Sequence, residues 1–289
     1  ALLQSGVAYV GGYQGAPVSH LMDVLADAHD VLGELGVHFE ACANEAGAAA
    51  MLGASINYPL RGAVTWKSVV GTNVASDALS NLASAGVKGG ALIVIGEDYG
   101  EGASIIQERS HSFAMKSQIW LLDPRPNLPC IVNMVEQAFE LSEASSTPVM
   151  LELRIRACHV HGSFECKDNR KPKFSKLNPI AKPAFDVGRI PLPPANYAQE
   201  KHKIEVRLPA AQKFIRERQL NEFFPGELHD IGIVLQGGMY NTLMRALQQF
   251  GLADAYGAAK IPLYVLNVTY PLLPDEVARF CSGKRAVLV

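Results

Sequence analysis

A carboxylate stands at the start of a helix that is unusually rich in small residues. Glu45 follows Asn44, and residues 46–55 read Ala-Gly-Ala-Ala-Ala-Met-Leu-Gly-Ala-Ser, so a neighbouring backbone or a flat ligand could approach closely. An apolar pocket here would disfavour the charged form of Glu45, which could then hold or pass a proton near neutral pH. The alternative is structural, because Asn and Glu commonly occupy a first helical turn, where they meet unpaired N–H groups and the helix dipole.

Three further segments predict strand-to-helix crossings that could position such a carboxylate. Residues 61–77 indicate a strand, a glycine turn and a helix, and residues 89–98 indicate a buried strand that ends in an acidic loop. Residues 7–19 indicate another crossing, in which Pro17 suits a first helical position. Ligands of parallel α/β sheets bind beyond the carboxyl ends of the strands. The side chains expected to gather there are Tyr13, Glu45, Lys67 and Asp98.

Taken in order, these segments resemble the pyrimidine-binding domain of the thiamine-diphosphate-dependent 2-oxoacid:ferredoxin oxidoreductases, and most of all the alpha subunit of the indolepyruvate type. The resemblance covers most of residues 7–160 and resumes near Asp230. Its strongest parts are the Asn44-Glu45 helix start, residues 141–151, and the Lys67 to Asp77 segment, which follows the family pattern K-x-x-G-x-N-x-A-x-D with one extra residue before the glycine. The resemblance implies a subunit or fragment of an enzyme that decarboxylates a 2-oxoacid oxidatively, with an aryl-pyruvate such as indolepyruvate preferred.

The resemblance also assigns roles to individual residues. A glutamate at the position of Glu45 bonds to N1′ of the aminopyrimidine of thiamine diphosphate, and this favours the imino form that takes a proton from the thiazolium. Coenzyme A then collects the acyl group, and electrons leave one at a time to ferredoxin or another acceptor. The residues whose positions match the remaining cofactor contacts are Tyr13, Pro17, Lys67 and Asn73.

The chain departs from the family where the substrate carboxylate is expected. Relatives read Tyr-Pro-Gly-Thr-Pro-Ser, whereas this chain has Ala16 in place of the threonine, with Ser19 three residues later. The threonine would cap a helix and reach a carboxylate, and Ala16 does neither with its side chain. The substitution predicts altered substrate placement for a bulkier acid; the alternative is that Ser19 or another polar group takes over the cap and substrate choice is unchanged.

Arg109 and His111 are the polar groups expected to face the substrate. They follow the acidic loop of residues 97–104, in a region where relatives carry polar, glutamine-rich residues and an arginine. The alternatives are a surface charge on a helix for Arg109 and a packed polar side chain for His111.

The sequence lacks the motifs that would bind the rest of the cofactor. It contains no G-x-x-x-x-G-K-[ST] or G-x-G-x-x-G run, and no Gly-Asp-Gly motif followed by Asn, with which thiamine enzymes bind Mg²⁺ and diphosphate. We therefore expect another domain or subunit to bind the diphosphate and Mg²⁺. A gamma/beta-type partner subunit is expected as well.

The five cysteines predict that the electron-transfer centres also lie elsewhere. No C-x-x-C pair is present, so [4Fe-4S] clusters are expected on other domains or subunits. Cys158, His159, His161 and Cys166 would converge on a metal only if the chain turned sharply, and no metal site is predicted. Structural disulfides are not expected in a cytoplasmic enzyme.

Composition excludes several other classes of protein. The chain has 289 residues, is 48% hydrophobic and carries a net charge of −2, which gives no reason to expect nucleic acid or a membrane surface as a partner. No apolar run could cross a bilayer and no leader is seen, so a cytoplasmic location is expected. The first residue, Ala1, and a predicted buried strand at residues 285–289 suggest part of a longer polypeptide.

Alternating strand and helix patterns predict an α/β fold with a parallel sheet covered on both faces. The resemblance implies a pyrimidine-type thiamine-diphosphate-binding domain (residues 1–160), a linker (161–228) and a partial, transketolase C-terminal-like α/β domain (229–289). Strands are expected near residues 7–10, 36–39, 62–66, 90–95, 118–122 and 148–154, and a helical core stripe within residues 131–141. Two alternatives share the fold: a non-oxidative thiamine enzyme, or an assembly subunit that has lost the chemistry.

Overall fold

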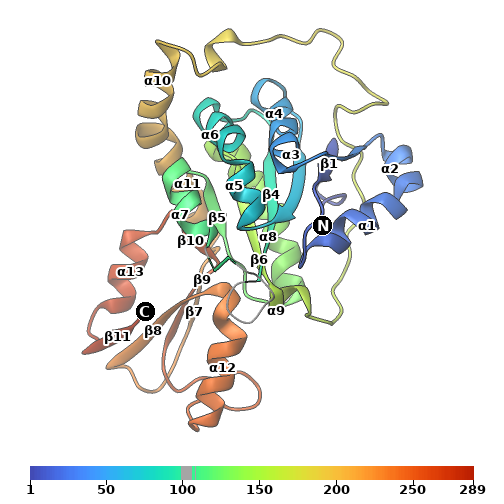
Figure 1. Cartoon of the computed structure of the whole chain (residues 1–289). Coiled ribbons are helices and arrows are strands. Elements are labelled where there is room, and N and C mark those ends of the chain that lie inside the picture. The colour runs from blue at the N-terminus through green and yellow to red at the C-terminus, as the bar shows by residue number, and fades with distance from the viewer. Residues whose placement is uncertain (99–105, 108) are drawn as a thin grey trace.

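The computed structural model describes residues 1–98, 106–107 and 109–289. Within these residues the strands form two sheets, one of seven strands and one of four, with helices packed around them (Figure 1). This arrangement confirms the predicted α/β class. None of the described helices is both long and apolar enough to span a membrane.

The larger sheet is parallel except at one edge. Its strand order is β10-β5-β6-β4-β3-β1-β2, and only β10 runs antiparallel to its neighbour. The central strands are almost wholly buried, as expected when helices cover both faces. All six strands expected in this part of the chain are present. The strands are β1 (Tyr9–Gly12), β2 (His38–Ala41), β3 (Gly62–Lys67), β4 (Ala91–Glu97), β5 (Trp120–Leu122), β6 (Val149–Arg154) and β10 (Val268–Tyr270).

Helices cover both faces of this sheet. Alternate side chains of its strands belong to two separate hydrophobic core clusters, one on each face. The predicted helical stripe is confirmed, because Met134, Ala138 and Phe139 are buried on the long helix α8. Asn127 caps that helix by accepting a hydrogen bond from the Cys130 N–H at 2.9 Å. The helices are α1 (Ser19–Asp27), α2 (His29–Leu35), α3 (Glu45–Met51), α4 (Ala54–Asn57), α5 (Val70–Val74), α6 (Ser76–Ala85), α7 (Ser110–Ser117), α8 (Leu128–Ser145) and α9 (Ile155–Cys158).

After α9 the chain runs over the outside of the molecule and reaches α10 on the far side (Figure 1). One helix was predicted here from Ala210, Phe214 and Ile215, and α11 confirms it, whereas α10 was missed because its sequence lacks an apolar stripe. Buried Arg207 connects this segment to α6. It donates hydrogen bonds to the carbonyls at the end of that helix, such as Ala83 O at 2.9 Å. The elements are η1 (Val187–Arg189), α10 (Ala195–His202), η2 (Lys203–Arg207) and α11 (Leu208–Glu217).

The smaller sheet has the order β11-β8-β9-β7, in which only β7 is antiparallel to its neighbour. The strand predicted at the end of the chain is present as β11, at the edge of the smaller sheet, with Leu288 64% exposed. The elements are β7 (Glu222–Phe224), β8 (Ile231–Gln236), η3 (Gly237–Met239), α12 (Tyr240–Gln249), β9 (Leu263–Leu266), α13 (Pro274–Cys281) and β11 (Ala286–Leu288).

Two short strands tie the sheets together. β7 precedes residue 229 yet belongs to the smaller sheet, and β10 follows it yet pairs with β5 in the larger one, through Val268 and Leu122. The predicted domain limits at residues 160 and 228 stay a prediction. The pairing shows that the chain passes between the two sheets more than once.

Candidate functional site

The carboxyl ends of the parallel strands carry the polar side chains expected there. Lys67 ends β3 and Asp98 follows β4, and the Lys67 Nζ atom lies 2.9 Å from Oδ2 of Asp98. Tyr13 follows β1, and its N–H donates to Thr65 O at 3.0 Å. The Asp98 side chain is only 4% exposed, so it is held as a buried partner of the lysine. The sheet thus gathers these residues along one edge, as the parallel topology predicts.

The loop after β1 lies against this ion pair. A Cβ atom added to Gly15 would lie 2.4 Å from Cβ of Lys67, so only glycine permits the approach. Pro17 packs on β4, since a Cβ on Gly96 would lie 2.8 Å from the Pro17 Cδ atom. Pro17 and Lys67, for which cofactor contacts were predicted, therefore both lie at the loop that contains Gly15.

The helix α1 begins later than the sequence suggested. Its N-cap is Val18, which makes no side-chain cap, so Pro17 lies before the helix and Ser19 occupies its first position. Ala16 is exposed and precedes the cap by two residues. A threonine at position 16 would not be the N-cap residue, and Ser19 does not replace one. These expectations about capping were wrong, and the expected substrate role of both residues stays a prediction.

Glu45 lies in the first turn of α3 and is 7% exposed. Asn44 caps the helix: its Oδ1 atom accepts a hydrogen bond from the Gly47 N–H at 2.8 Å. The structural interpretation of this pair is therefore correct for Asn44. It does not explain the burial of Glu45, because a carboxylate that serves only the helix dipole can remain in water.

Gly71 sets the surroundings of Glu45. A Cβ atom at Gly71 would lie 2.5 Å from Cδ1 of Trp66 and 2.8 Å from Cγ of Glu45. The glycine of the Lys67–Asp77 motif thus lets α5 approach both side chains. Asn73 lies on the same short helix and is exposed. Its predicted contact with the cofactor stays a prediction.

A series of hydroxyl groups connects this region with α7. The Trp66 Nε1–H donates to Thr72 Oγ1 at 3.2 Å, and Thr72 Oγ1 lies 3.2 Å from the Ser68 hydroxyl. Ser68 in turn forms a short hydrogen bond with the hydroxyl of Ser110, the first residue of α7. All four side chains are buried, so the series runs inside the protein. Sequence reasoning did not identify it.

Arg109 and His111 flank Ser110 at the start of α7. Arg109 is the exposed N-cap residue, and its side chain does not form the cap hydrogen bond. His111 is largely buried: its Nε2 atom lies 3.0 Å from the Gln236 amide nitrogen, and its Nδ1 atom lies 3.6 Å from Oε2 of Glu152. Burial lowers the pKa of His111, so the neutral ring accepts from the amide through Nε2 and carries its proton on Nδ1.

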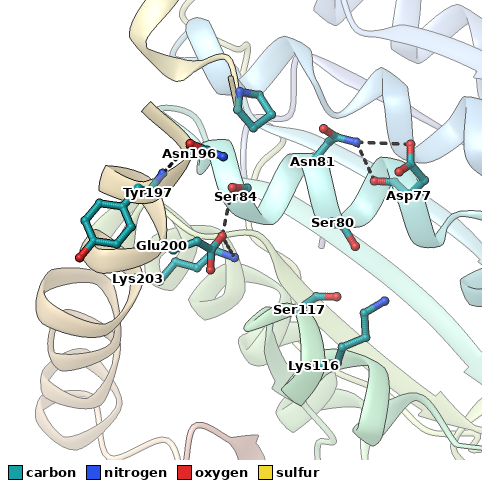
Figure 2. Close-up of a pocket in the computed structure, with 11 residues that line it drawn as sticks. Asp77, Ser80, Asn81, Ser84, Lys116, Ser117, Asn196, Tyr197, Glu200 and Lys203 are labelled. Atoms are coloured by element: carbon teal, nitrogen blue, oxygen red, sulfur yellow. Dashed lines mark hydrogen bonds and ion pairs between the residues drawn. The ribbon is translucent and has the colours of Figure 1, made fainter. Parts of the chain in front are cut away.

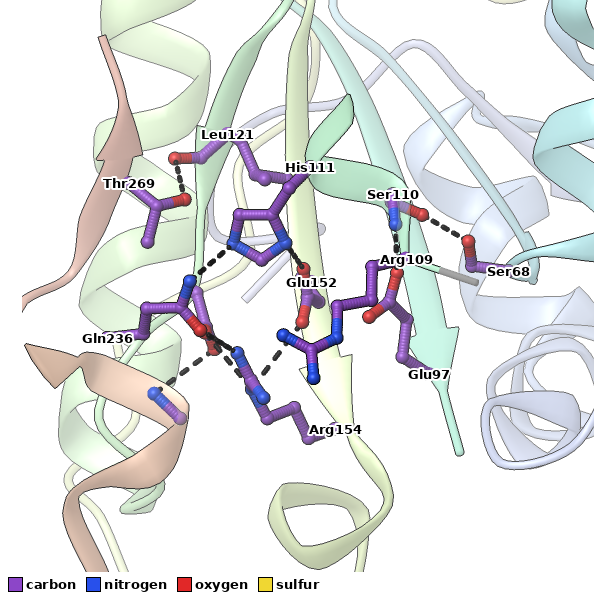
Figure 3. A network of polar contacts seen from close by, with 12 residues as sticks. Ser68, Glu97, Arg109, Ser110, His111, Leu121, Glu152, Arg154, Gln236 and Thr269 are labelled. Atoms are coloured by element: carbon purple, nitrogen blue, oxygen red, sulfur yellow. Dashed lines mark hydrogen bonds and ion pairs between the residues drawn. The ribbon is translucent and has the colours of Figure 1, made fainter. Parts of the chain in front are cut away.

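Buried acids surround this histidine, as Figure 3 shows. Arg154 Nη2 lies 2.6 Å from Asp123 Oδ2 and also donates to Gln236 Oε1 at 2.5 Å, while Arg154 Nε is 3.5 Å from Glu152 Oε1. Burial raises the pKa of Glu152 well above its usual value, and the charges of Asp123 and Glu97 raise it further. Burial also raises the pKa of Asp123, although Arg154 opposes this. The Glu152 carboxyl group therefore keeps its proton to a higher pH than an exposed carboxyl group does.

The sequence carried one signal of this cluster that was missed. Glu152 and Arg154 interrupt the apolar run of β6, which pairs in register with β4 on one side and β5 on the other. Charged residues in a central strand are rarely tolerated without partners. The acidic loop that precedes Arg109 falls, from residue 99 to residue 105, outside the described residues.

A separate polar pocket of about 640 Å³ lies between α6, the end of α7 and α10 (Figure 2). None of the residues predicted to bind cofactor or substrate lines it. Its polar side chains largely pair with one another, for example Lys203 Nζ with Glu200 Oε1 at 2.8 Å. Among the described residues, no group of three or more His, Cys, Asp and Glu side chains could hold a metal ion.

Comparisons with known proteins confirm the resemblance recognised in the sequence. No profile of a known protein family matches the chain. The indolepyruvate oxidoreductase subunit IorA of Methanothermobacter marburgensis is 29% identical over 293 residues, which cover 100% of this chain and 44% of the relative. The IorA subunits of Archaeoglobus fulgidus and Thermococcus kodakarensis are each 26% identical, over 99% of this chain. The chain thus spans less than half the length of these curated relatives.

A solved structure supports the fold. The 2-oxoglutarate:ferredoxin oxidoreductase from Magnetococcus marinus, determined with 2-oxoglutarate, coenzyme A and succinyl-CoA bound, superimposes with a TM-score of 0.70. The match covers 99% of this chain and 55% of that one, at 17% sequence identity. At this identity the likeness concerns the fold, and it places both sheets of this chain within one known architecture.

Proposed function

We propose that this chain, a homologue of the indolepyruvate-type subunits of the 2-oxoacid:ferredoxin oxidoreductase family, forms the part of such an enzyme that binds the aminopyrimidine of thiamine diphosphate and the 2-oxoacid. The observation that carries the proposal is the place of Glu45. Its carboxyl group is buried at the start of α3, where Gly71 packs closely against both Glu45 and Trp66. A carboxyl group held in this way is suited to hydrogen bonding with one ring nitrogen of an uncharged ligand.

The other residues predicted to contact the cofactor would act together with Glu45. Glu45 would hold the proton at N1′ of the aminopyrimidine, and Tyr13, Pro17, Lys67 and Asn73 would line the cofactor. Thiamine diphosphate, when bound, supplies the nucleophilic carbon and the electron sink that decarboxylation requires. The protein contributes orientation and proton transfer, and general acid–base catalysis of this kind is worth about 10²- to 10⁴-fold in rate.

The substrate would bind toward α7. Arg109 precedes the helix and is exposed, so its guanidinium is suited to an anionic carboxylate. Burial lowers the pKa of His111, and its ring lies between Gln236 and Glu152, so its proposed part in substrate binding would be to support the start of α7 beside Arg109. Ala16, on the loop beside Lys67, and Ser19, the first residue of α1, would complete the proposed substrate surface. The small Ala16 side chain leaves room for an aryl-pyruvate.

The remaining functions belong to parts outside this chain. We place the diphosphate and Mg²⁺ on another domain or subunit, since this chain lacks the corresponding motif. The [4Fe-4S] clusters, the gamma/beta-type partner, ferredoxin and coenzyme A would act there as well, and we expect the enzyme in the cytoplasm. The whole enzyme would form an acyl-coenzyme A and pass two electrons singly to ferredoxin.

The test is Glu45→Gln in the complete enzyme, with Glu40→Gln as the matched control. Glu40 is an exposed acid on neighbouring β2. The Gln side chain keeps the shape of Glu45 but cannot titrate, so 2-oxoacid-dependent reduction of a viologen dye should fall by about 10²- to 10⁴-fold. Binding of thiamine diphosphate, measured by calorimetry, should persist in both variants.

Three outcomes would contradict the proposal or part of it. Full activity of Glu45→Gln would remove Glu45 from the mechanism. Decarboxylation without electron transfer by the unaltered enzyme would indicate a non-oxidative thiamine enzyme. Absence of both thiamine binding and turnover would indicate an assembly subunit of the same fold.

A further inference from the structure

Four contacts hold the first turn of α7 in place. The Ser110 N–H donates to Glu97 Oε1 at 2.7 Å, and the Ser110 hydroxyl bonds to Ser68 at the end of β3. His111 is held between Glu152 of β6 and Gln236 of β8. Each contact comes from a different strand, so the start of this helix is fixed against both sheets (Figure 3).

The side chains that hold this turn are far more buried than Arg109, the N-cap residue of α7. Glu97 is 3% exposed and Glu152 1%, whereas Arg109, adjacent to Ser110 in the chain, is exposed. The Glu97 carboxylate also meets the positive end of the helix dipole, which strengthens the anchor. The first turn of α7 is therefore held by buried side chains, while the basic residue at its N-cap remains accessible to solvent.

The smaller sheet contributes directly to holding the first turn of α7. Gln236 ends β8 and uses both ends of its amide: the oxygen accepts from Arg154 Nη2 at 2.5 Å and the nitrogen meets His111 Nε2 at 3.0 Å. Two residues later, the Gly238 N–H donates to Asp123 Oδ1 at 3.1 Å. A shift of the smaller sheet would thus move the histidine and the helix turn that carries it.

We propose that Glu97 and Gln236 are positioning residues, which fix the first turn of α7 so that Arg109 meets the carboxylate of the 2-oxoacid. This inference rests on the proposed function, because it takes Arg109 as the substrate-binding cation. It adds a role for the smaller sheet, whose docking through Gln236 sets the geometry of substrate binding. Misplacement of a binding group by about 1 Å can cost up to roughly 10²-fold in rate.

The experiment compares Glu97→Ala, Gln236→Leu and Arg109→Ala, alone and combined, in the complete enzyme. Each of the first two should raise KM for the 2-oxoacid by roughly 10- to 100-fold while kcat changes less, because the chemistry at Glu45 is untouched. In the Arg109→Ala background neither should raise KM further. Glu97→Gln keeps an oxygen that accepts the Ser110 N–H, and it should restore KM to near the original value.

Two controls separate positioning from general damage. Glu143→Ala removes an exposed acid of α8, which binds Arg61 at 2.7 Å and makes no contact with α7, and it should leave KM unchanged. Hydrogen exchange of the amides of residues 110–113 should accelerate in Glu97→Ala and not in Glu97→Gln or Glu143→Ala.

The results that overturn the inference are distinct from those that overturn the function. If Glu97→Ala or Gln236→Leu leaves KM unchanged, or multiplies the KM of Arg109→Ala as strongly as that of the unaltered enzyme, these residues do not act through Arg109. Absence of 2-oxoacid turnover by the unaltered enzyme would instead refute the proposed function.

Discussion

Glu45 and Gly71 approach so closely that no side chain could stand between them: a Cβ atom on Gly71 would lie 2.8 Å from Cγ of Glu45. The same atom would lie 2.5 Å from Cδ1 of Trp66, whose ring is fully buried. Neither neighbour has space to withdraw, since the indole is packed in the core and Glu45 is fixed at a helix start. The glycine of this motif therefore serves close packing around the carboxyl group.

Gly71→Ala should displace Glu45 or α5 and lower activity far more than it lowers stability. We expect a loss of at least tenfold in kcat/KM, because a small misplacement of a catalytic group is costly, and weaker binding of thiamine diphosphate. Gly33→Ala is the matched control, because a Cβ there meets nothing within 4 Å and the residue lies inside α2. That control should stabilise the protein by about 0.4–1 kcal/mol. Equal activities of the two variants would show that Gly71 has no role in the site.

The Lys67–Asp98 pair should respond asymmetrically to removal of its two members. Asp98 is 4% exposed and Lys67 22%, so Lys67→Met leaves a buried carboxylate without its cation and should destabilise by about 3 kcal/mol. Asp98→Asn leaves a lysine that can reach water and should cost less. The double variant should be more stable than Lys67→Met alone. Denaturant unfolding of the three variants measures these differences, and additive free energies would show that the two groups are not coupled.

Local patterns predicted most of the larger sheet because its strands are short apolar runs separated by helices. The core stripe of α8 was predictable for the same reason, since one helical face repeats Met134, Ala138 and Phe139 regularly. The antiparallel edge strand β10 was not, because its pairing with β5 joins residues far apart in the chain. Nothing in the residues of β10 specifies a partner more than a hundred positions away.

The candidate site shows the same division between local and long-range information. The place of Glu45 at a helix start was predictable because its context is local: a cap residue, a helix and small side chains. The cluster of Glu97, Asp123, Glu152 and Arg154 was missed, because it exists only where three strands meet side by side. The role of Gln236 depends further on how the smaller sheet docks, which no local pattern encodes.

Ala16→Thr should change substrate preference with little effect on stability. Ala16 is exposed and lies outside the cap of α1, so the free energy of unfolding should change by less than about 0.5 kcal/mol. The added methyl and hydroxyl occupy the proposed substrate surface, so kcat/KM should fall more for an aryl-pyruvate than for pyruvate. A carbon-sized change in a pocket is worth about 1–3 kcal/mol in such a ratio. If the ratio for the two substrates stays the same in both proteins, Ala16 lies outside the substrate site.

Glu152→Gln should stabilise the protein increasingly as the pH rises. Burial raises the pKa of Glu152 in the native state, with Asp123 and Glu97 adding to the effect, whereas in the unfolded chain the carboxyl group titrates near about pH 4.3. Above that pH the unfolded chain binds fewer protons than the native state at this residue. The free energy of unfolding therefore falls by up to about 1.4 kcal/mol per pH unit, until the native pKa is passed.

Glutamine is neutral at every pH, so the substitution removes this slope while keeping the size of the side chain. The difference in free energy of unfolding between Glu152→Gln and the unaltered protein should be near zero at about pH 4 and should grow upward from there. Burial lowers the pKa of His111, so this residue acts in the opposite direction. It lowers the free energy of unfolding as the pH falls below about 6.5. It is present in both proteins, so its contribution largely cancels when they are compared at each pH. Chemical unfolding across a pH series measures the difference, with Glu40→Gln as an exposed control that should show no such trend. A difference that stays constant with pH would mean that Glu152 is ionised in the native protein.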